Sequence, residues 1–210
     1  MFRDLPPRAR WYIIAVIVLG AVTFFSLLPR AQFSPVLPLL FFVVISSLTS
    51  AFKVQFPITS GSNMSVSYVV DIAALIMRGP HTTMLIGACS GWAQSTFNAK
   101  TGNPPYRTLF NMSVLVLTME ASGQMFRAYG GSPDASLKDI AWPLLVMSIT
   151  YFAVNTIPIA IAIALTTNQS AFRIWKSEFL RSEPSYVIGA GTAAVVIAVT
   201  ETSGWWLAGC

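Results

Sequence analysis

The chain has 210 residues, of which 54% are hydrophobic and only 10% are charged. Soluble domains carry about 25% charged residues, so this composition excludes an ordinary soluble enzyme, a disordered chain and a coiled coil. The net charge of +5 suits the basic cytoplasmic loops of a membrane protein, and no basic patch interleaved with aromatic residues predicts nucleic-acid binding. The sequence therefore predicts an all-α polytopic membrane helix bundle.

Cysteine and histidine usage points to neither a metal site nor a cofactor. Cys89 and Cys210 lie far apart in apolar segments and form no CxxC motif, so no disulfide framework is expected. His81 is the single histidine and follows Pro80, where we expect a solvated helix N-terminus at the outer surface.

Apolar runs predict the order of helices along the chain. The first run spans residues 11–28 and is long enough to cross a bilayer; no small-residue cleavage site follows it, so we expect a retained helix rather than a signal peptide. Prolines, glycines and charged residues mark the ends of the later runs. The further helices are expected over residues 35–52, 65–77, 82–97, 107–129 and 140–166.

The last part of the chain predicts a change of pattern and then more membrane helices. Residues 171–181 place aromatic and apolar side chains on one face and basic ones on the other, with Ile174 as a misfit, which predicts a short amphipathic helix at the interface. A seventh membrane helix is expected over 185–200 and the start of an eighth over 205–210. We expect one integral membrane domain over 1–210, with seven to eight crossings, forming the N-terminal part of a longer polypeptide.

Charge placement predicts the orientation of these helices. With the N-terminus in the cytoplasm, nine basic residues fall on the inside and four on the outside, as the positive-inside rule requires. A bacterial inner-membrane protein with a cytoplasmic N-terminus is therefore expected.

Two local patterns bear on packing. Gly87 and Gly91 form a small-xxx-small spacing, which favours close helix contact in lipid. Residues 54–64 are first apolar and then rich in serine and glycine, and the helix expected after them is short for a crossing. Part of this stretch is expected at membrane depth as broken backbone, which is tolerated only inside protein or beside a wet cavity.

No Walker A, GxGxxG, HExxH or GxSxG string is present, so nothing supports catalysis within these residues. The polar residues inside apolar helices are more informative, because an ionisable group at membrane depth costs at least a few kcal/mol. Asp71, Glu120 and Asn155 are such residues. They indicate either a ligand or ion site between helices or buried hydrogen bonds and ion pairs that fix packing, with Gln124 one turn from Glu120.

Other candidates flank these positions. Arg107 and Asn111 share a helix face; Arg107 either extends to lipid head groups or bridges to Asp71 or an anionic ligand. Ser62 and Asn63 either bind a ligand at a helix N-terminus or act as a plain N-cap. The full candidate ligand-binding set is Ser62, Asn63, Tyr68, Asp71, Arg107, Asn111, Glu120 and Asn155.

Three stretches carry a resemblance: SGSNMSVSYVVD at residues 60–71, NPPYRTLF at 103–110 and FLRSEPSY at 179–186. Together they resemble the N-terminal membrane region of bacterial signalling proteins, in which a MASE-like multi-helix sensor precedes a cytoplasmic GGDEF or HD-GYP domain that makes or breaks cyclic di-GMP. The helix pattern is also similar, more loosely, to the substrate-binding S components of energy-coupling-factor transporters. Those have six helices, whereas seven and the start of an eighth are expected here.

The resemblance implies a sensory input domain. It would detect a small ligand or a membrane state and pass the signal through the eighth helix to a cytoplasmic output domain, as a homodimer. The segment before residue 65, with Asp71 and the helix over 107–129, is the expected site. The alternatives are a transporter or S-component-like binding protein, and a passive membrane anchor.

Overall fold

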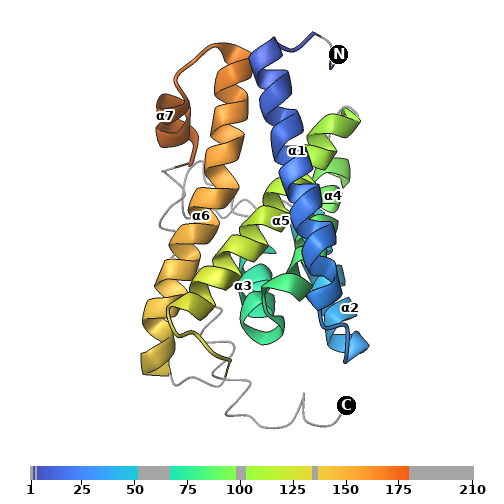
Figure 1. Cartoon of the computed structure of the whole chain (residues 1–210), viewed down its shortest axis with the longest axis vertical. Coiled ribbons are helices and arrows are strands. Elements are labelled where there is room, and N and C mark those ends of the chain that lie inside the picture. Colours follow the sequence, from blue (N-terminus) through green and yellow to red (C-terminus); the bar gives the residue numbers. More distant parts are fainter. Residues whose placement is uncertain (1, 3, 52–66, 98–102, 134–136, 180–210) are drawn as a thin grey trace.

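The computed structural model describes residues 2, 4–51, 67–97, 103–133 and 137–179. Within these ranges all regular structure is helical (Figure 1). Helix α1 spans Pro7–Leu27 and ends in a 3₁₀ turn; the elements after it are α2 (Val36–Ala51), α3 (Ser67–Arg78), α4 (Pro80–Phe97), α5 (Pro105–Ala128), α6 (Leu137–Thr167) and α7 (Ala171–Ile174). The all-α prediction is confirmed.

The six helices predicted up to residue 166 exist, but four of them begin two to four residues earlier than the apolar runs suggest. Pro7, Pro80 and Pro105 each occupy a first helical position. Proline is favoured there because its missing N–H would have no helical partner and its φ suits a helix. The expected helix starts at residues 11, 82 and 107 are therefore wrong by two to four residues.

Residues 171–179 also differ from prediction. A short α7 passes directly into a π-helical turn at Trp175–Phe179. Ile174, which misfits the amphipathic pattern, is buried against Ala160 and Ala164 of α6. The Trp175 indole N–H donates to Thr156 Oγ1 at 2.9 Å, so Ile174 and Trp175 hold this segment against the C-terminal half of α6.

Helices α4 and α5 pack closely against each other, and glycine makes this contact possible. A Cβ placed on Gly91 would lie 2.9 Å from Met112 Cα, and one on Gly87 would lie 2.9 Å from Met119 Cγ. The predicted small-xxx-small contact is confirmed, and its partner is the middle of α5. Gly20 of α1 approaches α5 in the same way, because a Cβ placed on it would lie 2.7 Å from Ser113 Cα.

The outer surface is strongly apolar. Two described helical segments, Pro7–Arg30 and Asp139–Thr167, are long and apolar enough to cross a membrane, and Val36–Ala51 is apolar but shorter. Only 11% of the most apolar 18-residue stretch of the first span is buried, whereas the core helix of a soluble protein is mostly covered. Trp11, Phe25 and Leu37 are each at least 70% exposed. Apolar surface of this extent indicates contact with lipid or another apolar partner.

One short helix, α3, lies inside the bundle. Helix α3 has 12 residues, about 18 Å at 1.5 Å per residue, too short to cross a bilayer alone. Tyr68, Asp71, Ile72 and Leu75 recur at helical spacing and are all buried. This placement puts a carboxylate in the core. The predicted helices over 185–200 and 205–210 lie outside the described residues.

Candidate functional site

A buried carboxylate joins three helices at the centre of the bundle. Asp71 of α3 is 0% exposed. Its Oδ1 accepts a hydrogen bond from the Ser46 hydroxyl of α2 at 2.7 Å, and its Oδ2 accepts one from the Tyr151 hydroxyl of α6 at 2.8 Å. Each carboxylate oxygen therefore has a donor from a different helix, so the relative positions of α2, α3 and α6 depend on this one group.

Aromatic and hydroxyl contacts extend this centre. The Tyr68 ring packs edge-on against the Tyr151 ring, with centroids 4.8 Å apart. One turn along α2 from Ser46, the Ser50 hydroxyl lies 2.5 Å from the Ser90 hydroxyl of α4. We call Ser46, Tyr68, Asp71 and Tyr151 the carboxylate centre. It brings together two predicted candidates, Tyr68 and Asp71, with two residues that were not predicted.

Ser46 and Tyr151 were not predicted, because a single hydroxyl in an apolar helix is a weak signal beside an ionisable group. A signal for Ser46 exists in the sequence: Leu39, Phe42, Ser46 and Ser50 follow helical spacing, and all four are buried. A serine on the buried face of an otherwise apolar helix needs a partner. Which residue it meets is not visible in the sequence, because the partner is 25 positions away.

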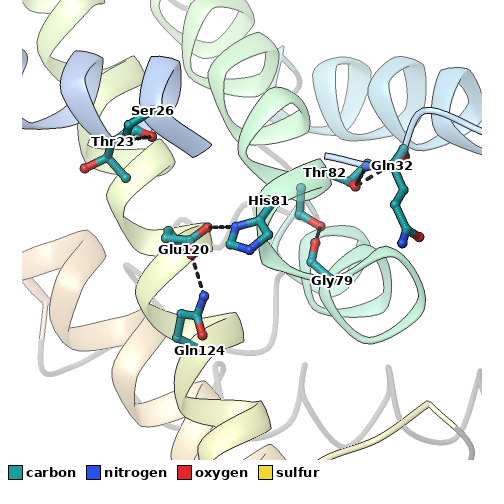
Figure 2. A network of polar contacts seen from close by, with 9 residues as sticks. Thr23, Ser26, Gln32, Gly79, His81, Thr82, Glu120 and Gln124 are labelled. Atoms are coloured by element: carbon teal, nitrogen blue, oxygen red, sulfur yellow. Dashed lines mark hydrogen bonds and ion pairs between the residues drawn. The ribbon is translucent and has the colours of Figure 1, made fainter. Parts of the chain in front are cut away.

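Glu120 belongs to a second polar cluster, at the start of α4 (Figure 2). Its Oε2 lies 3.0 Å from His81 Nδ1, and its Oε1 accepts a hydrogen bond from Gln124 Nε2 at 2.7 Å. The expected Glu120–Gln124 proximity is confirmed. The expectation of a solvated His81 is wrong: its side chain is 17% exposed, because the first turn of α4 packs against α5 and turns the ring toward Glu120.

Arg107 and Asn111 lie apart from both clusters, in the first turns of α5. The predicted bridge from Arg107 to Asp71 does not form; the Arg107 guanidinium is exposed and donates from Nε to the Tyr106 hydroxyl at 3.3 Å. Asn111 Nδ2 donates to Ser95 Oγ of α4 at 3.0 Å. Both side chains line a cavity between α1, α5 and α6.

The remaining candidates do not join these groups. Asn155 is half-buried on α6, next to the Thr156 that holds Trp175. Ser62 and Asn63, with the stretch over 54–64, lie outside the described residues. The candidates therefore divide among a carboxylate centre, a histidine–glutamate cluster and a cavity, rather than forming one site. Within the described residues, no group of three or more histidine, cysteine or acidic side chains is placed to hold a metal ion.

A helical bundle with an apolar outer face and hydrogen-bonded polar groups inside it is the pattern of a membrane-embedded domain. The comparison with protein families agrees: the family model named MASE9 matches residues 16–200. The chain belongs to the MASE9 family of membrane sensor domains, which confirms the predicted resemblance to a MASE-like region. Such domains are generally non-catalytic and typically serve as input to signalling domains. No curated protein and no solved structure matches the chain.

Proposed function

We propose that this MASE9 domain is the input part of a bacterial inner-membrane signalling protein that controls cyclic di-GMP turnover. The domain crosses the membrane seven to eight times with its N-terminus in the cytoplasm, and detects a small ligand or a membrane state. It acts without a cofactor, as a homodimer joined through the eighth helix and the residues after it. The family match over 16–200 carries the proposal.

The carboxylate centre provides a way for a signal to change how the helices α2, α3 and α6 pack together. A signal biases a two-state element only through a difference in free energy between the two states. Asp71 is bound by one donor from α2 and one from α6, so a rearrangement that separates these helices must break one of the two bonds. Loss of either donor is therefore expected to change the equilibrium between the state in which both bonds are intact and the state in which the helices have separated.

Removing the Tyr151 hydroxyl tests this role. Tyr151→Phe deletes one donor to Asp71 and leaves the ring, so cyclic di-GMP turnover by the polypeptide that carries this domain is expected to change about fivefold or more, the usual lower range of coupling between sites. Turnover is measured in membranes, with the amount of folded protein determined in parallel.

Tyr12→Phe is the matched control, because the Tyr12 hydroxyl also joins two helices, donating to the Pro158 carbonyl at 3.3 Å, but does not contact Asp71. Unchanged turnover in Tyr151→Phe, or an equal change in both folded variants, would contradict the proposal. A passive anchor predicts that neither variant changes turnover.

A further inference from the structure

The cavity between α1, α5 and α6 has a volume of about 370 Å³ and opens partly to the surroundings. It lies at the end of the bundle where α1 and α5 begin and α6 ends (Figure 1). Small-molecule sites in proteins have volumes of about 300–1,000 Å³, so the space suits a small ligand or one end of a larger one. It is separate from the carboxylate centre and from the His81–Glu120 cluster.

The two sides of this cavity differ in chemistry. Ile13 of α1 and Ile159 and Ala162 of α6 provide an apolar wall, while Asn103, Arg107 and Asn111 provide a polar rim where α5 begins. An inorganic anion would leave the apolar wall without a partner. A plain hydrocarbon would leave the guanidinium unused. The cavity therefore suits a molecule with one charged end and one apolar end.

The polar rim is arranged for an anion. Arg107 is exposed, and its guanidinium carbon lies 6.0 Å from the centroid of the Tyr106 ring. Among the described residues no carboxylate is paired with Arg107. The first turn of α5 contains no acidic residue, and its N-cap, Pro104, has no capping side chain. The positive end of the helix dipole therefore adds to the field of the guanidinium.

The amides of the rim are held by α4. Asn103 Nδ2 donates to the Ser95 carbonyl at 2.8 Å, and Asn111 Nδ2 donates to the Ser95 hydroxyl at 3.0 Å. These bonds fix the start of α5 against the end of α4. The rim is thus positioned before any ligand arrives, which reduces the entropy lost on binding.

We propose that this cavity binds an anionic amphiphile, with its phosphate or carboxylate head on Arg107 and its alkyl chain along Ile13, Ile159 and Ala162. The molecule is either a phospholipid of the bilayer or a free single-chain acid or phosphate; the chemistry recognised is the same. This proposal goes beyond the input function, because binding is expected whatever output the domain controls.

The test measures binding to the whole chain in nanodiscs. Nanodiscs with equal amounts of phosphatidylglycerol and phosphatidylcholine are examined by native mass spectrometry for lipid retained by the protein. In parallel, octyl phosphate and inorganic phosphate are titrated into phosphatidylcholine nanodiscs. Retained phosphatidylglycerol identifies a bilayer source; binding of octyl phosphate without retained phosphatidylglycerol identifies a free amphiphile. Either result supports the proposal, provided that inorganic phosphate binds about tenfold or more weakly than octyl phosphate, as the loss of a few buried methylene groups requires.

Variants distinguish the contribution of the ligand's anionic head to binding from the contribution of its alkyl chain. Arg107→Gln is expected to lower the affinity about tenfold, the effect of losing one charged hydrogen bond, and Arg107→Lys to restore part of it. Ala162→Phe fills the part of the cavity beside the apolar wall and is expected to lower the affinity without a change of charge. Arg173→Gln removes a cation that is exposed on α7 and does not line the cavity, and should bind as the wild type does.

Three results would overturn the proposal. The first is retention of phosphatidylcholine equal to that of phosphatidylglycerol, together with no binding of octyl phosphate. The second is inorganic phosphate binding as tightly as octyl phosphate. The third is an equal loss in Arg107→Gln and Arg173→Gln when both variants elute as folded protein. None of these readouts depends on cyclic di-GMP, so a failure here is distinct from a failure of the input function.

Discussion

Replacing Asp71 with alanine is expected to lower the thermal midpoint of the detergent-solubilised domain by roughly 4–8 °C. The substitution removes the acceptor for the Ser46 and Tyr151 hydroxyls, and hydrogen bonds inside membrane bundles contribute about 1 kcal/mol each. Each kcal/mol corresponds to roughly 2–4 °C for a protein of this size. The midpoint is measured by the loss of the folded peak in size-exclusion chromatography after heating.

Two companion variants define the origin of this loss. Asp71→Asn retains one carbonyl oxygen as an acceptor and should lose about half as much. Asp139→Ala removes an exposed carboxylate in the first turn of α6 and should lower the midpoint less than Asp71→Ala does, because interactions of solvent-exposed charges contribute little to stability. If Asp71→Ala is no less stable than Asp139→Ala, the carboxylate centre does not hold the three helices together.

Replacing Gly91 with alanine is the second large effect, with an expected loss of about 1–3 kcal/mol. The new Cβ would lie 2.9 Å from Met112 Cα and 3.1 Å from Met112 N. Backbone atoms cannot move aside as a side chain can, so α5 itself must shift away from α4. Thermal stability in detergent measures the loss.

Gly87→Ala is the matched comparison one turn away on the same helix. Its Cβ would lie 2.9 Å from Met119 Cγ, and methionine is flexible enough to repack. A smaller loss is expected, although the Leu115 carbonyl oxygen at 3.3 Å limits the space. A loss in Gly87→Ala that equals or exceeds that in Gly91→Ala would contradict this account of the α4–α5 contact.

Sequence patterns predicted the helices well because helix formation depends mainly on residues that are close together in the chain. Hydrophobic runs and prolines located α1–α6 to within a few residues, and the Gly87–Gly91 spacing predicted a close contact that α5 provides. The proximity of Glu120 and Gln124 followed from one helical turn. Each of these inferences needs only residues that are neighbours on one helix.

The partners of the buried polar groups were not predictable in the same way. Tyr151 is 80 positions from Asp71, and His81 is 39 positions from Glu120. Such pairs depend on how whole helices pack, which no single-helix pattern contains. For the same reason Asp71, Glu120 and Arg107, which were predicted as parts of one candidate site, lie in three separate places. A polar residue in an apolar helix indicates that the residue needs a hydrogen-bond partner. It does not indicate which residue that partner is.

Regulation of a cyclic di-GMP output in the same polypeptide is tested most directly by reading the coding sequence past the codon for Cys210. The account predicts a continuing eighth helix followed by a GGDEF or HD-GYP domain on the cytoplasmic side. A stop codon just after that helix would contradict it.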